Sequence, residues 1–77
     1  MMNLMDVPVG QSARLTSVAA LLQVKLRKHG LHVGDRVRVL RQAPLGGPLL
    51  VEANGREVAL GRGVAKKIFV EVECASH

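Results

Sequence analysis

The dipeptide Asn54-Gly55 separates two short segments, Pro48 to Ala53 and Arg56 to Leu60, each of which has one apolar face. Asn-Gly is the strongest two-residue hairpin pattern, because both central residues of a type I′ turn need a positive φ. The sequence therefore predicts an antiparallel hairpin. Two strands alone are not stable in water, so the rest of the chain must supply strands that cover the apolar face.

Three further segments alternate in the manner of half-buried strands: Ser12 to Val18, Asp35 to Ala43 and Ile68 to Cys74. In the second of them, Val37 and Val39 face one way while arginines face the other. In the first, alternation predicts two sides, one with Ala13, Leu15 and Ser17 and the other with Arg14, Thr16 and Val18.

The segment Val18 to Gly30 has the spacing of a helix. Basic residues fill its last turn, and Gly30 suits the left-handed position that ends a helix. Either Thr16 or Ser17 is the expected N-cap. The expected buried stripe consists of Val18, Leu21, Leu22 and Leu26.

The predicted order is thus strand, helix and four strands, with a break at Gly61 to Lys67 that has room for one helical turn. So few short strands can enclose one core by curling into a partly open barrel. We expect a mainly β fold, a small SH3-like β-barrel of about five strands with one α-helix between the first and second strands. Residues 1–77 are expected to form a single domain, with 74–77 a frayed tail.

The chain carries 11 Lys and Arg against 6 Asp and Glu, a formal charge of +5. This balance is compatible with nucleic acid, an anionic membrane surface or an acidic protein partner. Small barrels that bind nucleic acid usually stack bases on aromatic side chains, and Phe69 is the single aromatic residue, so nucleic acid is not the expected partner. A small basic RNA-binding barrel remains an alternative.

The longest apolar run, Val18 to Leu22, is far too short to span a bilayer, so membrane insertion is not expected. The opening residues lack the pattern of a signal peptide, and the lone Cys74 fits a reducing compartment. These features predict a cytoplasmic protein. A thin core and an open barrel edge leave self-association open.

No set of residues resembles a catalytic centre, so the protein is not expected to be an enzyme. Weak candidates for metal ligands are His29 and His32, three apart around Gly30, and the closing C-x-x-H of Cys74 and His77. Such donors suit iron or zinc. No cofactor is required by the sequence, and a metal-responsive module is kept as an alternative.

The segment Pro44 to Pro48, Pro-Leu-Gly-Gly-Pro, is unusual for a connection between two strands. In one interpretation the glycines and prolines only shape the turn and Leu45 is incidental. In the other, Leu45 is an exposed apolar knob on a loop, where partner contacts are often made. Composition alone does not choose between them.

A set of glycine, proline and apolar positions occurs in a fixed order along the chain: Gly30, Leu31, Gly34, Val37, Val39, Ala43, Pro44, Leu45, Gly46, Gly47, Pro48, Gly55, Leu60, Ala65, Ile68 and Val70. With this ordered set, the sequence resembles the FeoA family of ferrous iron transport proteins. The resemblance covers nearly the whole chain and is densest over Leu26 to Val72. The resemblance implies an SH3-like barrel that works in the cytoplasm with the FeoB-type membrane transporter and its GTPase domain, and that lies at the inner membrane through this partner.

From the resemblance and the exposed knob together, the loop Pro44 to Pro48 is the expected partner-binding element. Its residues are Pro44, Leu45, Gly46, Gly47 and Pro48. The basic residues expected to assist it are Arg41, Arg62, Lys66 and Lys67.

Overall fold

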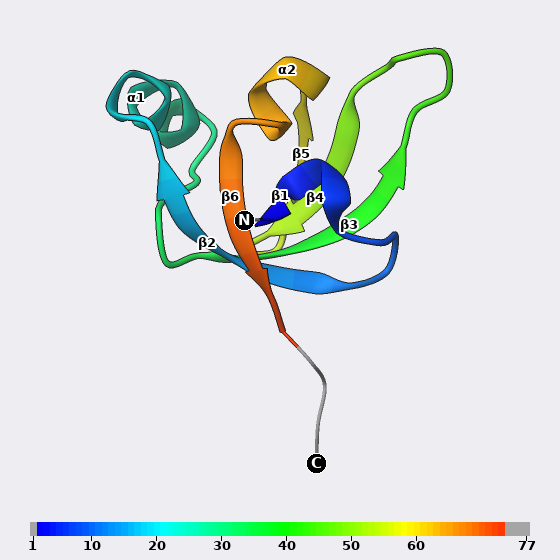
Figure 1. The fold of residues 1–77 in the computed structure, drawn as a ribbon, viewed down its shortest axis with the longest axis horizontal. Helices are drawn as coiled ribbons and strands as arrows, with labels where there is room; N and C mark the ends of the chain where they lie inside the picture. Colours follow the sequence, from blue (N-terminus) through cyan, green and yellow to red (C-terminus); the bar gives the residue numbers. More distant parts are fainter. Residues whose placement is uncertain (1, 74–77) are drawn as a thin grey trace.

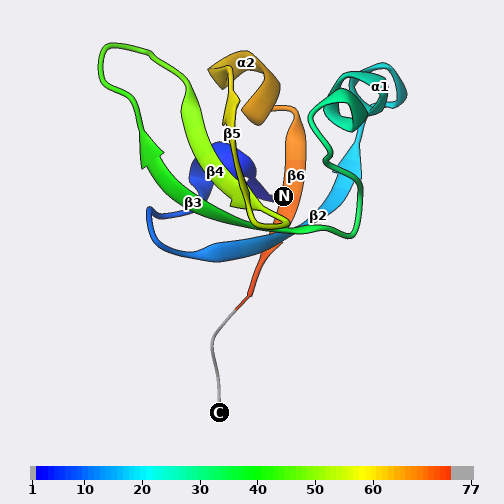
Figure 2. The same cartoon turned by 180° about the vertical axis from the view of Figure 1, so that it is seen from behind.

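The computed structural model describes residues 2–73. Its six strands form one antiparallel sheet in the order β1-β6-β2-β3-β4-β5. The sheet curls strongly around a single apolar interior (Figures 1 and 2), which gives the expected SH3-like, partly open barrel. The strands are β1 (Met2–Asn3), β2 (Ser12–Val18), β3 (Arg36–Gln42), β4 (Leu49–Ala53), β5 (Arg56–Leu60) and β6 (Ile68–Val72).

The helical elements are η1, a 3-10 turn (Leu4–Asp6), α1 (Ala20–Lys28) and the short α2 (Arg62–Ala65). α1 lies between β2 and β3, as predicted, and α2 occupies the predicted break. Figure 1 places α1, α2 and the β3–β4 connection at one end of the barrel. None of the helices over residues 2–73 has the length and apolarity that a bilayer crossing would need.

The two strands β4 and β5 confirm the hairpin predicted from Asn54-Gly55. Leu49 pairs with Leu60 and Val51 with Val58, and all four side chains are buried. Asn54 and Gly55 have φ of 54° and 78°, as a type I′ turn requires.

The N-terminal segment adds a strand and a 3-10 turn that the sequence reading did not predict. β1 pairs with β6 at the sheet edge. The Asn3 side chain accepts a hydrogen bond from the Met5 amide at 2.8 Å, and Asp6 accepts one from the Asn3 amide at 3.0 Å, which makes a capping box. This turn delivers Leu4 and Val7 into the core, so the sheet has six strands rather than five.

Strand β2 contains a bulge between Leu15 and Ser17 where it pairs with β6. The extra residue shifts the alternation by one. Val18 is therefore buried opposite Ile68, while Ser17 is exposed. The prediction that Ser17 faces the core side and Val18 the other side was wrong for this reason.

The end of α1 confirms the predicted glycine cap. Gly30 has φ of 77°, its amide donates to the Arg27 carbonyl, and the Leu31 amide donates to the Leu26 carbonyl. This is the Schellman pattern, and it turns Leu31 into the core, where it is 1% exposed.

The start of α1 differs from the prediction. Thr16 and Ser17 still belong to β2, and the Thr16 hydroxyl donates to the Phe69 carbonyl instead of capping the helix. The N-cap is Ala19, whose side chain makes no capping bond. Because the helix starts at Ala20 rather than Val18, the buried stripe is narrower than expected: Leu26 is buried, Leu22 is partly buried, and Leu21 is 91% exposed.

Candidate docking surface at one end of the barrel

The β3–β4 loop closes through two backbone hydrogen bonds. The Gly47 amide donates to the Pro44 carbonyl at 3.1 Å, and the Ala43 amide donates to the Pro48 carbonyl at 3.0 Å. Leu45 and Gly46, between them, have φ of 58° and 76°. Two consecutive residues with positive φ inside such a bond are typical of a type I′ turn, with Leu45 at its tip.

Leu45 is an unusual residue for this position. Its side chain is 104% exposed, and its backbone is left-handed, a conformation that costs an L-residue with a β-carbon roughly 1–2 kcal/mol. Glycine or asparagine would be favoured here. Neither burial nor backbone preference explains a leucine at the tip, so this residue is the strongest candidate for a contact with another molecule.

Steric crowding explains why position 47 is glycine, whereas nothing comparable explains the leucine at position 45. A β-carbon at Gly47 would lie 2.6 Å from the Ala43 β-carbon and 3.2 Å from the Pro44 carbonyl oxygen. Only glycine lets the two sides of the loop approach this closely. The structural interpretation of the loop therefore accounts for Gly46 and Gly47 but not for Leu45.

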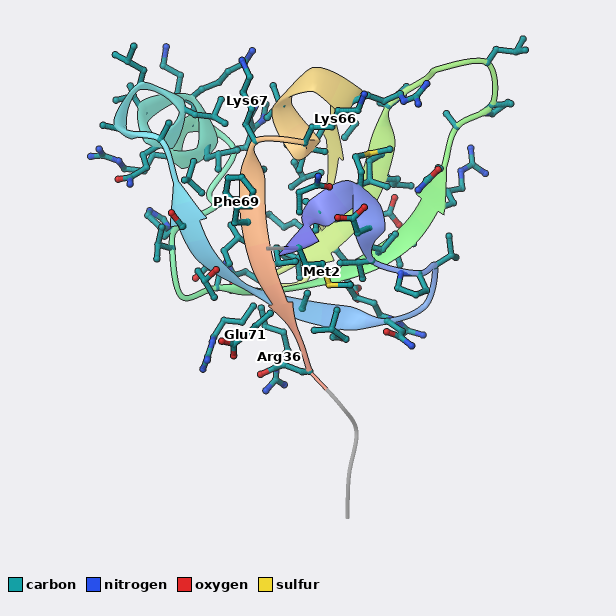
Figure 3. The ribbon with its side chains drawn as sticks, viewed as in Figure 1. Met2, Arg36, Lys66, Lys67, Phe69 and Glu71 are labelled. Carbon is teal, nitrogen blue, oxygen red and sulfur yellow. The ribbon has the colours of Figure 1, made fainter. Side chains whose placement is uncertain are left out.

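Of the four predicted basic residues, Arg62 lies directly beside the loop: a β-carbon at Gly46 would be 3.2 Å from its Nη1 atom. Arg41 is exposed near the end of β3, where that strand enters the loop. Lys66 and Lys67 follow α2, and Figure 3 shows them at the same end of the barrel.

This end is basic because the segments that form it, residues 20–28, 41–48 and 62–67, contain no carboxylate. All six acidic residues lie outside these segments. Five of them lie in or beside strands, and the sixth, Asp6, lies in η1. Within residues 2–73, no ion pair involves the seven cations of this basic end. They are Lys25, Arg27, Lys28, Arg41, Arg62, Lys66 and Lys67.

Toward the opposite end, positive and negative charges are paired. Arg14 lies 3.2 Å from Glu71, and Arg36 pairs with Glu73. Figure 3 shows Arg36 and Glu71 far from Lys66 and Lys67. The net charge of the protein is therefore concentrated where the loop and the two helices meet.

The sequence reading also missed the outward side of α1. Leu21 and Val24 are 91% and 52% exposed, and Lys25 and Lys28 share their side. These four positions have the i, i+3, i+4, i+7 spacing of one helical face, so the pattern was present in the sequence. The prediction that Leu21 belongs to the buried stripe was wrong, and it concealed this face.

The predicted metal ligands are only partly within the described residues. His29 is the C-cap of α1, and its carbonyl accepts a hydrogen bond from Arg56 at 3.2 Å. His32 lies 3.6 Å from Asp35 through its Nδ1 atom, at an exposed turn. Residues 2–73 contain no group of three or more side chains that could hold a metal ion, and Cys74 and His77 lie outside that range. Metal binding stays a prediction.

The model of the FeoA domain family matches residues 2–72. A Methanocaldococcus jannaschii protein provisionally named Fe(2+) transport protein A is 36% identical over 47 residues, which are 61% of this chain and 55% of that protein. The aligned part thus spans about half the length of this curated relative.

Two solved structures share the fold. The FeoA protein of Chlorobium tepidum is 36% identical, with a TM-score of 0.85 over 99% of this chain and 74% of its own. The iron(II) transport protein A of Clostridium thermocellum is 32% identical, with a TM-score of 0.82 over 92% of this chain and 45% of its own. The family model spans nearly every described residue of the barrel, and the chain therefore belongs to the FeoA domain family.

Proposed function

We propose that the protein is an accessory component of ferrous iron uptake, which docks on the cytoplasmic part of a FeoB-type transporter through the β3–β4 loop. The observation that carries the proposal is Leu45, a fully exposed leucine held in a left-handed conformation at the loop tip. The names of the relatives supply the iron transport context.

In this proposal Leu45 is the apolar anchor, and it enters a pocket on the transporter. Burying one leucine side chain contributes about 1.5–3 kcal/mol. The two backbone hydrogen bonds hold the loop in one conformation, so little backbone entropy is lost when Leu45 binds. Arg62 beside the loop and Arg41 at its base add attraction to an acidic rim around that pocket.

Docking gives the protein a regulatory role and requires no chemistry of its own. A small barrel bound to the transporter can favour one conformation of the GTPase domain only by binding that conformation more tightly. The binding site for the protein would then lie in the cytoplasm, at the inner face of the membrane.

The sharpest test is Leu45→Asn, measured by calorimetric titration against the purified cytoplasmic domain of the transporter, with and without a GTP analogue. Asparagine tolerates the left-handed conformation and keeps the charge unchanged, so the variant removes the apolar contact alone. We expect affinity to fall at least about tenfold, from the lost burial of one leucine. The free energy of unfolding should rise by about 1 kcal/mol because the backbone is relieved.

The matched control is Leu21→Asn, which makes the same change at another exposed leucine. It should bind the soluble domain like the wild type. Wild-type affinity in Leu45→Asn would remove the loop from the proposal. Equal losses in both variants would show that the contact is not specific to the loop.

A further inference from the structure

The outward face of α1 consists of Leu21, Val24, Lys25 and Lys28. All four residues are exposed, and of the two apolar ones Leu21 is 91% and Val24 52% exposed. A single exposed leucine needs no explanation. Here two apolar residues lie one turn apart with two lysines on the same helical face, a combination typical of helices that rest on a membrane surface.

We propose that this face of α1 docks on an anionic phospholipid surface. Leu21 and Val24 enter the boundary between headgroups and acyl chains, and Lys25 and Lys28 reach the lipid phosphates. Lysine suits this arrangement because its aliphatic stem can lie along apolar surface while its ammonium group stays with the headgroups.

Charge complementarity selects the lipid as the occupant. The segment from residue 17 to residue 34 carries three cations, Lys25, Arg27 and Lys28, and no carboxylate. α2 with its following lysines lies at the same end of the barrel and adds three more, Arg62, Lys66 and Lys67 (Figures 1 and 3). Each basic residue near an anionic membrane adds attraction, and all six act together.

Two other occupants fit less well. A second copy related by a two-fold axis would bring Lys25 and Lys28 against the same residues of the first copy, which is repulsive. Single-stranded nucleic acid would call for stacking side chains. Phe69, the one aromatic residue, is half-buried on β6 and does not belong to α1.

The inference goes beyond the proposed docking on a transporter and does not depend on it. The lipid contact uses α1, whereas the protein contact uses the β3–β4 loop. The two variants that test them change different residues, so either contact can fail alone.

The test is co-sedimentation with vesicles, because the chain has no Trp or Tyr to report binding by fluorescence. Vesicles of phosphatidylcholine with 3 parts in 10 phosphatidylglycerol should bind the wild-type protein, and pure phosphatidylcholine vesicles should not. Binding should weaken steeply as salt rises, since exposed charges are screened.

The variant Lys25→Gln, Lys28→Gln should reduce partitioning roughly thirtyfold, from two basic contacts. The control Arg14→Gln, Arg38→Gln removes the same net charge from exposed positions on β2 and β3 and should change partitioning far less. Leu21→Ser, with the charge unchanged, should reduce it roughly fivefold through the lost apolar contact.

Failure of the wild-type protein to bind anionic vesicles at low salt would overturn the inference. So would equal losses in the two double variants, which would indicate attraction to net charge alone, or retention on a single-stranded oligonucleotide but not on vesicles. Circular dichroism confirms that each variant is folded before binding is compared.

Discussion

In the β3–β4 loop, the fold explains the residue type at position 47 but not at position 45. Gly47 is required by the fold, since a β-carbon there would collide with Ala43. Leu45, two positions earlier, is opposed by its own backbone conformation and buries nothing within the described chain. Because Leu45 does not stabilise the fold, it is the residue of this loop to test for a contact with another molecule.

The steric argument at Gly47 makes a direct prediction. Gly47→Ala should lower the free energy of unfolding by about 1–3 kcal/mol, because the added methyl group lies 2.6 Å from the Ala43 β-carbon. Gly63→Ala is the matched control. Gly63 lies within α2 and has nothing within 4 Å of an added β-carbon, so stability should rise by about 0.5–1 kcal/mol. Urea unfolding of both variants measures these two changes in stability. An unchanged urea midpoint for Gly47→Ala would contradict the close contact between residue 47 and Ala43.

At this scale the sequence predicts an exposed loop-tip leucine, and the structure confirms that exposure. It does not predict the left-handed conformation of Leu45, because leucine is a rare residue at that position. Arg62 is among the basic residues that the sequence predicts to assist the loop, but only the folded structure shows that it lies beside Gly46, because the two residues come from separate elements.

At the scale of elements, the first turn of α1 is held less firmly than its last turn. Only Ala19 separates it from β2, so the hydroxyl residues that could cap it are still in the strand. Its first turn has no side-chain hydrogen bond to its free amides, whereas its last turn has the full glycine cap. We infer that the helix frays from its first turn.

A side chain that caps this turn should therefore stabilise the protein. Ala19→Ser places a hydroxyl at the N-cap, and the free energy of unfolding should rise by about 1 kcal/mol. Ala20→Ser, one residue into the helix, lacks the capping geometry and should be neutral or slightly destabilising. Thermal unfolding of the two variants provides the comparison, and a result in the reverse order would refute the uncapped start.

The elements that the sequence predicts well are those with a strong local pattern. Asn54-Gly55 marks the hairpin, and Gly30 marks the end of α1. β1 was missed because two residues show no alternation, although the Asn3 and Asp6 spacing of the capping box was readable. The bulge in β2 was not predictable from alternation, because it depends on pairing with β6, more than 50 residues away.

The whole barrel depends on its N-terminal segment more than the sequence suggests. Leu4 is 0% exposed and joins the strands and α2 in one core. Leu4→Ala should reduce the free energy of unfolding by about 2–5 kcal/mol, a large share of the stability of a domain this small. Leu21→Ala, an exposed leucine, should leave it nearly unchanged. If both variants changed the free energy of unfolding only slightly in a urea titration, the N-terminal turn would not unfold cooperatively with the barrel.

The SH3-like class follows from the count and order of short strands, and the structure bears it out. The charge arrangement does not follow from the sequence, in which the cations look scattered. Lys25, Arg41 and Lys66 are far apart along the chain, but the β2–β3, β3–β4 and β5–β6 connections bring α1, the β3–β4 loop and α2 to the same end of the barrel (Figure 1). Charges in those connections therefore gather, and only the topology reveals it.

The separation of unpaired cations at one end from ion pairs near the other gives the molecule a permanent electric dipole. Near a negatively charged surface this dipole rotates the protein before contact is made. In most first encounters the basic end, with the helices and the β3–β4 loop, therefore faces the surface. At physiological ionic strength this turning acts over only about 8 Å. Diluting the salt extends its range, and the rate of productive encounters should then rise even where the final contacts are unchanged.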